Sequence, residues 1–386
     1  MARGTIITRP LKDGRKSYHA VLWVDRPGGG QRQVWKTFYR KRDAESYLDE
    51  KSKLVREGDF VQPARITFGD FANEWLDKYP KLAEKPMKPS TLTGYHSIID
   101  AHLLPFFRDI QLGHIRTALI EKDFKGQLPP SLSPKSVRNI LLVLRRMLES
   151  AVDWDYLPVN PFRSRKSVKL PKLSGEQKGR ALTPEEIRKL LGACMDDAHT
   201  IVGTAILSGM RRAEIFGLPW ESLDFKNNQI HVKQSLYVKT GKYWAESERG
   251  YVLISPKSKA SIRSIDMSPM LRKILLEHRM ACGNPEKGLV FVNSEGNPVD
   301  PDNFVKRRFL PAVKAAGIGK VRFHDLRHTF GSLKLEQGEN IKYVQVQMGH
   351  SDIKVTLDVY GHLLKDSNPA AAAKTDRLIF GDKAAV

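Results

Sequence analysis

The sequence has 386 residues, of which 41% are hydrophobic and 28% are charged. This length favours two or three domains, each able to bury a core of its own. The formal net charge of +21 favours a polyanionic partner, because every lysine or arginine that docks on a phosphate releases counterions. The alternative explanations of the charge are a merely soluble basic protein and one bound to anionic lipid.

The cysteines and the apolar stretches exclude several classes of protein. Cys194 and Cys282 lie far apart and lack the spacing of a disulfide scaffold or a zinc module, which fits a reducing compartment. No stretch approaches the roughly 18 apolar residues of a membrane span, and the basic N-terminus lacks the apolar core of a signal peptide. We therefore expect a protein that stays in the reducing compartment where it is made, without a membrane partner.

The N-terminal segment predicts a small sheet followed by a helix. Residues 17–25 and 32–39 alternate in hydropathy and are rich in aromatic and β-branched residues. The turn Pro27-Gly28-Gly29-Gly30 would join them as a hairpin, and TIITRP would add a third strand. Asp43 is the candidate N-cap of the helix, and Gly58 is its candidate end.

This segment is also strongly basic. From Arg3 to Arg42 there are 11 basic residues against two acidic ones. A small basic sheet with exposed aromatic side chains can lay one face in a DNA groove. The alternative is a sheet whose aromatic side chains pack only on its own helix. The charge favours DNA contact.

Residues 65–165 predict a helical domain. Thr67 stands at capping-box spacing ahead of one apolar helical pattern, Pro89-Ser90 precedes a second, and Ser133-Pro134 combines an N-cap with a proline at the first helical position. The last helix has a stripe at three-to-four spacing, made of Val137, Ile140, Leu141, Leu144, Leu148 and Val152. Its arginines lie mostly off the stripe, where they face either phosphates or solvent.

A basic stretch interrupts the helical periodicity before the last domain. RSRKSVKLPKLSGEQKGR carries seven basic residues against the single acid Glu176. We expect residues 166–180 to be an interdomain linker that tracks a DNA backbone, with an ordinary solvated linker as the alternative. Thr183-Pro184-Glu185-Glu186 then combines an N-cap, a proline and a capping-box glutamate, which places a domain boundary just before it.

Residues 181–386 predict helices on both sides of a strand-rich insert. QIHVKQSLYV (229–238), YVLISP (251–256) and IRSIDMS (262–268) read as strands of one small antiparallel sheet. After the insert, Gly338 and Gly349 frame a helix, IKYVQVQM, and Ser351 is the candidate cap of the next.

The residues around this second set of helices could perform phosphoryl transfer. Breaking a phosphodiester without a metal requires fixed cations on the nonbridging oxygens, a nucleophile in line and an acid for the leaving oxygen. His324 and Arg327 share a helix face at i and i+3, and Tyr360 is an oxygen nucleophile on a following helix. Upstream, Glu214 is three residues after Arg211 and can orient its guanidinium. Taken singly, each is more often a packing or surface residue, so their joint occurrence carries the prediction.

Three motifs resemble those of the tyrosine recombinase, or phage integrase, family. SGMRRAEIFGL (208–218) resembles the first arginine box, with serine where threonine is usual. HDLRHTFGS (324–332) is similar to the His-x-x-Arg box, and MGHSDIKVTLDVYGH (348–362) to the box that ends in the nucleophilic tyrosine. The match covers nearly the whole of 180–362, and three motifs in this order are highly specific.

The resemblance implies a role for each matching residue. Arg211 and Arg327 would clamp the scissile phosphate, and His350 would hydrogen-bond one of its oxygens. His324 would assist proton transfer from the tyrosine. Tyr360 would form a 3′-phosphotyrosyl link and release a 5′-hydroxyl. No metal or cofactor is implied, and no ATP is needed because the phosphotyrosine keeps the energy of the broken bond.

The general acid of the family is a lysine on a β-hairpin. Lys257, in SPKSKASIRSIDM, matches it, although Asp266 stands where proline is more usual. Lys259 remains an alternative, because residues two apart in an extended strand point the same way. Lys239 and Lys242 form a second lysine-bearing turn that superficially resembles the same box.

The resemblance also implies a multidomain α+β fold. Its parts are an arm-type DNA-binding domain with a three-stranded sheet and a helix (1–60), an all-α SAM-like core-binding domain (65–165), the linker (166–180), and a mainly α catalytic domain with a small antiparallel sheet and a C-terminal tail (181–386). The tail, with apolar Leu378, Ile379 and Phe380, is expected to dock on a neighbouring protomer.

The function implied is that of an integrase that acts on double-stranded DNA at core and arm sites as a homotetramer. It would integrate or excise a mobile element such as a prophage, with an excisionase or DNA-bending factor as a further partner. Relaxation of DNA by a type IB topoisomerase-like monomer is one alternative. The other is a DNA-binding regulator without catalysis.

Overall fold

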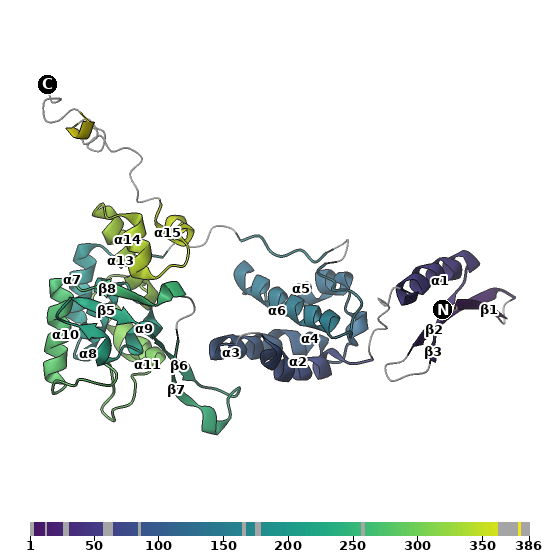
Figure 1. Cartoon of the computed structure of the whole chain (residues 1–386), viewed down its shortest axis with the longest axis horizontal. Helices are drawn as coiled ribbons and strands as arrows, with labels where there is room; N and C mark the ends of the chain where they lie inside the picture. Colours follow the sequence, from purple (N-terminus) through teal and green to yellow (C-terminus); the bar gives the residue numbers. More distant parts are fainter. Residues whose placement is uncertain are drawn as a thin grey trace. The chain divides into compact units, whose positions relative to one another are not determined.

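The computed structural model describes residues 4–11, 14–25, 31–56, 65–83, 86–163, 167–173, 179–255, 259–361 and 377–379. The chain forms two compact units, Met1–Ser174 and Gly175–Val386 (Figure 1). The first holds a small sheet with its helix and a set of helices, and the second holds the three motifs. Among the residues described, no helix is both long enough and apolar enough to cross a membrane.

The N-terminal sheet is antiparallel in the order β1-β2-β3, with α1 packed against it. The bounds are β1 Gly4–Pro10, β2 Lys16–Asp25, β3 Gln31–Phe38 and α1 Lys41–Arg56. All three predicted strands are confirmed, whereas the predicted turn at 27–30 and helix end at Gly58 lie outside the described residues. Alternate residues of β2, including Ala20 and Leu22, are buried with Leu48 of α1.

Asp43 is not the N-cap of α1. The helix begins at Lys41, because the carbonyl of Arg40 already accepts the first helical bond from Ala44 N–H at 3.4 Å. Asp43 lies in the first turn, where its charge still complements the positive end of the helix.

Some aromatic side chains of this segment pack on its own helix, and others are exposed, so each of the two predicted alternatives holds for part of the set. Phe38 stacks at a tilt on Tyr47 of α1, with ring centroids 5.3 Å apart. Trp35 and Tyr39, in contrast, are 47% and 74% exposed. Part of the aromatic set is therefore core, and part remains open to a partner.

The helices of the first unit enclose a separate apolar core. Their bounds are α2 Phe68–Leu82, α3 Pro89–Ile98, a π-helical segment Ile99–Leu103, α4 Leu104–Phe107, a π-helical segment Leu119–Phe124, α5 Lys125–Gln127 and α6 Pro134–Asp153, with a 3₁₀ turn at Leu112–His114. Thr67 and Ser133 cap α2 and α6 as predicted, by accepting the N–H groups of Asp70 and Ser136. The α6 stripe is confirmed as core, since it packs within this cluster.

The second unit is mainly helical around a second core. Its helices are α7 Pro184–Ala193, α8 Asp197–Ser208, α9 Arg212–Phe216, α10 Pro269–Ala281, α11 Pro301–Phe304, a π-helical segment Val305–Phe309, α12 Leu310–Ala315, α13 Phe323–Glu336, α14 Ile341–Met348 and α15 Ile353–Tyr360. Its strands are β4 Leu223–Asp224, β5 Gln229–Val232, β6 Ser235–Lys239, β7 Gly250–Ile254 and β8 Arg263–Asp266. The predicted capping box on Thr183 is confirmed, with Glu186 as its other half.

The predicted single sheet of the insert is wrong. Residues 229–238 form two strands: β5 joins β4 and β8, and β6 pairs only with β7 within the described part of the chain. The chain changes sheets at Gln234, whose side-chain amide donates to the carbonyl of Gly217 at 2.9 Å. Gly217 allows β6 to pass close by, because a Cβ there would lie 2.5 Å from the backbone nitrogen of Leu236.

The three C-terminal helices pack on one another and carry two of the motifs (Figure 1). Gly349 ends α14 in the left-handed conformation, with φ of 66°, as its predicted role as a helix breaker requires. Ser351 does not cap α15. Asp352 does, because its carboxylate accepts the N–H of Lys354 at 2.8 Å.

Candidate active site

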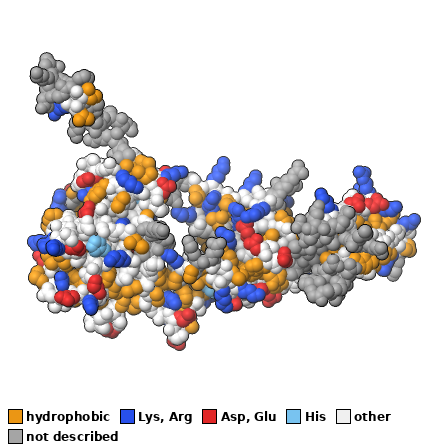
Figure 2. Space-filling view, in the orientation of Figure 1, with side chains coloured by type: hydrophobic (Ala, Val, Ile, Leu, Met, Phe, Trp, Pro, Cys, Tyr) orange, Lys and Arg blue, Asp and Glu red, His pale blue; other side chains and the backbone are white. Residues whose placement is uncertain are grey.

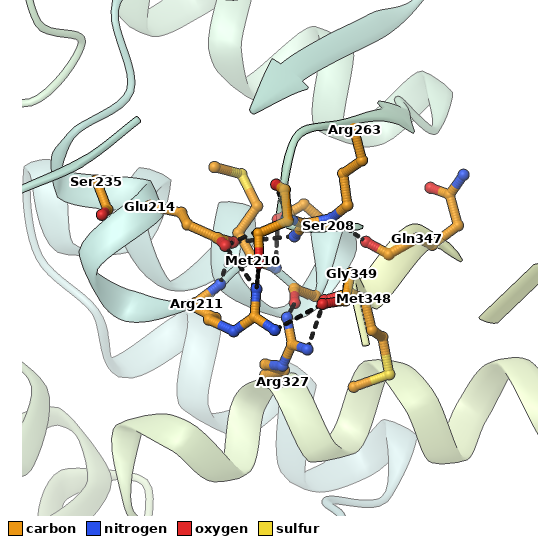
Figure 3. A network of polar contacts seen from close by, with 12 residues as sticks. Ser208, Met210, Arg211, Glu214, Ser235, Arg263, Arg327, Gln347, Met348 and Gly349 are labelled. Atoms are coloured by element: carbon orange, nitrogen blue, oxygen red, sulfur yellow. Dashed lines mark hydrogen bonds and ion pairs between the residues drawn. The ribbon is translucent and has the colours of Figure 1, made fainter. Parts of the chain in front are cut away.

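Charged side chains from separate elements converge in the second unit (Figure 3). Arg211 directly precedes α9, Glu214 lies inside α9, and Arg263 opens β8. Glu214 Oε1 accepts hydrogen bonds from Arg211 Nη1 at 2.8 Å and from Arg263 Nη1 at 3.2 Å. Its Oε2 accepts from Arg263 Nη2 and from the Arg211 backbone N–H, both at 2.9 Å. Glu214 therefore has the contacts needed to orient Arg211.

The charge state of Glu214 depends on these contacts. Burial alone would raise the pKa of this carboxyl group, whose side chain is only 3% exposed. The hydrogen bonds and charge of Arg263, followed by the charge of Arg211, outweigh burial and lower the pKa. The carboxylate is thus ionised, and it fixes two guanidinium planes at once.

Arg327 and Arg211 both reach the C-terminal end of α14. Arg327 Nη2 donates to the carbonyl of Met348 at 2.5 Å, and Arg211 Nη2 donates to that of Gly349 at 2.7 Å. Arg327 Nη1 also donates to the carbonyl of Gly209, at the end of α8, at 2.6 Å. Because terminal helix carbonyls carry partial negative charge, this end of α14 attracts both guanidinium groups.

We call Arg211, Glu214, Arg263 and Arg327 the arginine cluster. It sets three guanidinium groups against one carboxylate, so positive charge is in excess. Burial and the positive charges of Arg211 and Arg263 lower the pKa of Arg327, with Glu214 opposing. The side chain of Arg211 is 37% exposed and opens the cluster to solvent. The arrangement suits an anion such as a phosphodiester, which would supply the missing negative charge.

The structure brings His324 and His350 to this region from two elements. His324 lies on α13 one turn before Arg327, and its side chain keeps contact with solvent. His350 follows Gly349, and its Nδ1 is 2.9 Å from the hydroxyl of Thr356. Burial, followed by the charges of Arg327 and Arg211, lowers the pKa of His350 to about 3. Burial and the neighbouring His328 lower the pKa of His324. Both imidazoles are therefore neutral near pH 7 and able to accept or donate one hydrogen bond each.

Tyr360, the last residue of α15, is buried against α13 and is 2% exposed. Its hydroxyl is 2.9 Å from His328 Nδ1. The ring covers Gly331, where a Cβ would lie 2.8 Å from Tyr360 Cζ and 2.9 Å from Met348 Sδ. Burial raises the pKa of Tyr360, and the charge of Arg327 only partly offsets this. We call His328, Gly331 and Met348 the tyrosine slot.

Two residues of this site were not predicted from the sequence. Arg263 lies in a strand pattern with no catalytic signal of its own, and only the fold brings it to Glu214. His328 had a detectable signal, because it is four residues after His324 and therefore on the same helix face. Asp266, which replaces the usual proline, accepts hydrogen bonds from Tyr343 and Gln347 and so ties β8 to α14.

The general-acid lysine stays a prediction. Lys257 lies outside the described residues, and Lys259 begins a 3₁₀ turn, Lys259–Ser261. The two lysines of the other turn have aromatic partners: Lys239 Nζ is 4.4 Å from the ring centroid of Trp244, and Lys242 Nζ is 5.1 Å from that of Tyr243. In the tail, Leu378 and Ile379 are 86% and 64% exposed, and their predicted docking is untested.

Comparison with known families matches both the site and the helical domain. Residues 180–367 match the phage integrase family, and residues 67–125 match the phage integrase N-terminal SAM-like domain. The chain belongs to the phage integrase family. It is therefore a tyrosine recombinase, an enzyme that breaks and rejoins DNA, as the three motifs predicted.

Relatives and solved structures of this family resemble the chain over most of its length. The tyrosine recombinase XerC-like protein of Caldanaerobacter subterraneus subsp. tengcongensis is 27% identical, over 92% of this chain and 95% of the relative. The ICEBs1 integrase of Bacillus subtilis is also 27% identical, over 86% and 89%. The Tn1549 transposon integrase, solved with transposon right end DNA, aligns with a TM-score of 0.64 at 21% identity, over 81% of this chain and 100% of that one.

A lambda integrase tetramer bound to a Holliday junction aligns over 94% of this chain and 96% of its own, with a TM-score of 0.55 at 18% identity. These two structural likenesses confirm the predicted multidomain α+β fold.

Proposed function

We propose that Tyr360 is the nucleophile with which this recombinase forms a 3′-phosphotyrosyl link to DNA. The proposal is carried by the way in which three helices, α13, α14 and α15, converge. Arg211 and Arg327 meet at the end of α14, and Tyr360 packs on the same helix, α13, that carries Arg327. Attack of the phenol oxygen on phosphorus releases a 5′-hydroxyl, and the reverse attack rejoins the strand.

The other site residues take their roles from their contacts. Arg211 and Arg327 would bind the nonbridging phosphate oxygens in the positively charged cluster, and His350 would donate a hydrogen bond to one of them. His324, beside Arg327, is proposed to assist proton transfer. Glu214 acts as a positioning residue for Arg211.

The hydroxyl of Tyr360 is too buried to meet a phosphate where it lies. Attack requires the phenol to turn out of the tyrosine slot, or the slot to open, when DNA binds. Tyr360 is the last residue of the eight-residue helix α15, so a displacement of that helix would move the phenol with it.

The first unit is proposed to hold the DNA. Its sheet, with exposed Trp35 and Tyr39, would form the arm-type domain of residues 1–60, and its helices the core-binding domain of residues 65–165. Figure 2 shows lysine and arginine side chains spread over the described surfaces of both units. With a net charge of +21, such surfaces suit a phosphate backbone. The linker, 166–180, would join these domains to the catalytic domain, 181–386.

We further propose that the protein acts as a homotetramer on paired duplexes in the bacterial cytoplasm, where it integrates or excises a mobile element. The support is the alignment with the lambda integrase tetramer over most of this chain. An excisionase or a DNA-bending factor would set the direction of the reaction. Arm and core attachment sites would be the DNA partners.

The nucleophile is tested with a nicked suicide duplex that carries the sequence selected by this protein from a random DNA library. In EDTA, the full-length protein should form a covalent adduct, Tyr360→Phe should form none, and both should bind the duplex equally. Tyr251→Phe, at an exposed tyrosine of β7, is the matched control and should react as wild type does. An adduct from Tyr360→Phe would refute the assignment, and loss of the wild-type reaction in EDTA would refute a metal-free mechanism.

The general acid is tested with a substrate whose leaving group is a 5′-thiol, which needs no protonation. Lys257→Ala should lose cleavage of the ordinary duplex and regain it with the thiol. Rescue of Lys259→Ala but not of Lys257→Ala would move the role to Lys259.

The domain assignment is tested by deleting residues 1–60. The shortened protein should cleave core sites and lose high-affinity binding to arm sites. Unchanged arm binding would refute the assignment.

A further inference from the structure

Arg263 lies buried inside the arginine cluster (Figure 3). Its side chain is 3% exposed, whereas that of Arg211 is 37% exposed. Four of its N–H groups are used within the protein: two donate to the carboxylate of Glu214, at 3.2 and 2.9 Å, and two donate to main-chain carbonyls. Because these bonds occupy four of the five donors of a guanidinium group, Arg263 serves to hold protein groups rather than a phosphate.

The two carbonyls that Arg263 bonds belong to different segments of the site. Arg263 Nε donates to the carbonyl of Gln347, in the last turn of α14, at 2.7 Å, and Nη1 donates to the carbonyl of Ser261 at 3.1 Å. The guanidinium also packs on Gly349, where a Cβ would lie 2.9 Å from Arg263 Nη1. One side chain therefore joins the end of α14, just ahead of His350, to the turn that precedes β8.

Gln347 fastens β8 to α14 at both ends of the strand. Its main-chain carbonyl accepts from Arg263, the first residue of β8, and its side-chain oxygen accepts the N–H of Asp266, the last residue, at 3.0 Å. Gln347 is 5% exposed, so both bonds lie away from solvent. The strand is thus fixed against the same helix whose end accepts hydrogen bonds from Arg211 and Arg327.

Ser261 is the point at which the arginine cluster holds the turn before β8. It ends the 3₁₀ turn Lys259–Ser261 and is buried. Its carbonyl accepts a hydrogen bond from Arg263, and its hydroxyl accepts one from Arg211 Nη1 at 3.5 Å. Two guanidinium groups of the cluster therefore contact one residue of this turn.

The connection that contains this turn does not have the geometry of a tight hairpin. β7 pairs with β6, whereas β8 pairs with β5 in a different sheet. In the described part of the chain no ladder joins β7 to β8, so strand pairing does not fix the position of the connection. Lys257 and Lys259, the candidates for the general acid, stand four and two residues before Ser261 in the sequence. Because four residues of chain span at most about 14 Å, holding Ser261 limits where either lysine can reach.

We propose that Arg263 is a positioning residue for the general acid, because it holds Ser261, and with it the lysine-bearing turn, on the cluster that binds the scissile phosphate. The inference rests on the proposed phosphotyrosyl mechanism. In the step concerned, the bond from phosphorus to the 5′-oxygen breaks, and the leaving oxygen takes a proton from the lysine ammonium group. In rejoining, the neutral amine takes back the proton of the 5′-hydroxyl as its oxygen attacks phosphorus.

This role differs from that of Glu214. Glu214 orients Arg211, which would act on the nonbridging oxygens of the phosphate, whereas Arg263 would act on protonation of the leaving oxygen through the turn. The two effects are separable, because a leaving group that needs no proton removes the need for the second and keeps the need for the first.

The central test measures single-turnover cleavage of the suicide duplex by Arg263→Lys, once with the ordinary 5′-oxygen and once with a 5′-thiol as the leaving group. Lysine keeps the charge opposite Glu214 but cannot also hold Gln347 and Ser261. Relative to wild type, cleavage of the ordinary duplex should slow by about 100-fold, at the lower end of general-acid catalysis, and the thiol should restore most of that loss. Equal slowing on both duplexes would overturn the proposal and leave Arg263 as a support for Arg211 alone. A wild-type rate on the ordinary duplex would overturn it as well.

A loss of stability would not produce this result. The two rates are compared within one protein preparation, so the fraction of folded protein cancels from their ratio. Ser261→Gly is a milder variant, because it leaves the contacts between Arg263 and Glu214 in place and loosens only the turn. It should slow cleavage of the ordinary duplex by less than Arg263→Lys does, and the thiol should again restore the rate. The same slowing of Ser261→Gly on both duplexes would count against the proposal.

Two further arginine variants serve as references. Arg327→Lys changes the phosphate clamp and should slow cleavage of both duplexes by the same factor. Arg279→Lys is the matched control away from the site, at an arginine whose Nε donates to the carbonyl of Pro285 at 3.1 Å. It should cleave both duplexes as wild type does.

A double variant shows whether Arg263 and the lysine act in one step. The lysine variant that the thiol rescues, Lys257→Ala or Lys259→Ala, should be slowed little further on the ordinary duplex by Arg263→Lys, because the proton donor is already missing. Multiplication of the two separate effects would overturn the proposal. If wild type forms no adduct at all, the proposed function fails. If wild type reacts and Arg263→Lys is slowed equally on both duplexes, only this inference fails.

Discussion

The arginine cluster and the tyrosine slot lie side by side in one unit but are held by different kinds of interaction. Glu214 alone accepts four hydrogen bonds from Arg211 and Arg263, and Arg327 is fixed by two backbone carbonyls. Tyr360 has one side-chain hydrogen bond within the described chain, to His328, and otherwise rests on apolar contacts with Gly331 and Met348.

The difference follows from what each part must do. Groups that stabilise charge in a transition state work best when they are fixed beforehand, because then no reorganisation is needed during reaction. Tyr360, the proposed nucleophile, lies buried and would have to move toward its phosphate. Many charged contacts around Tyr360 would oppose that movement, whereas one hydrogen bond and apolar neighbours oppose it less.

The largest expected effect tests how firmly the arginine cluster is held. Glu214→Gln removes the carboxylate charge shared by Arg211 and Arg263, and should lower the free energy of unfolding by about 3–5 kcal/mol, as loss of one partner of a buried ion pair does. Urea unfolding of the protein measures it. Glu185→Gln, at an exposed glutamate paired with Lys189, is the control and should leave the free energy of unfolding close to that of wild type. An equally small effect of Glu214→Gln would mean that the cluster is not held by this charge.

Arg211→Lys should separate charge from geometry. Lysine keeps the positive charge but cannot bond Glu214, Gly349 and a phosphate at the same time, so cleavage should slow by about 10²–10³-fold. Single-turnover cleavage measures the rate, and filter binding measures affinity. Arg308→Lys, at an exposed pair with Asp196, should leave both unchanged. A wild-type rate for Arg211→Lys would contradict a bidentate role.

Gly331→Ala tests the packing of the tyrosine slot. The added methyl group would overlap the ring of Tyr360 and the sulfur of Met348, and should lower stability by about 1–3 kcal/mol. Gly192→Ala in α7 meets no atom within 4 Å and should be neutral or slightly stabilising. If Gly331→Ala is as harmless as Gly192→Ala in urea unfolding, the slot is not tightly packed.

The smallest expected effect is the fall in stability as the pH is lowered. The folded state lowers the pKa of His350 to about 3, and it also lowers the pKa of His328 and of His324. Below the ordinary histidine pKa of about 6.5 the unfolded chain therefore binds protons that the folded chain does not, and stability falls as pH falls. Each such histidine adds up to about 1.4 kcal/mol per pH unit over that window.

Urea unfolding between about pH 7 and pH 5, above the carboxyl range, measures this slope. His350→Asn should flatten it, whereas His231→Asn serves as the control for loss of a histidine elsewhere in the unit. A slope that is the same in His350→Asn as in wild type would contradict the protonation argument.

Local features of the fold were predictable from the sequence because their causes are local. The caps at Thr67, Ser133 and Thr183 depend on residues three positions apart, and the buried stripe of α6 depends on helical spacing. The two helix starts that were predicted wrongly were also decided locally, by which neighbouring residue formed the first helical hydrogen bond or cap. Asp352 displaced Ser351 as the cap of α15, and α1 began before Asp43 because the preceding carbonyl was already in helical position.

The sequence by itself determined which residues could perform the chemistry: the motifs held Arg211, Arg327, His324, His350 and Tyr360. Only the tertiary structure decided how they meet. Arg211 bonds a carbonyl 138 residues away and Arg327 one 118 residues away, and the split of residues 229–238 between two sheets was invisible to their alternation. Residue spacing along one helix or strand records local geometry, whereas the partner of a buried charge or hydroxyl is chosen by the packing of distant segments. For that reason Arg263 and His328 emerged as members of the site only once the chain was folded.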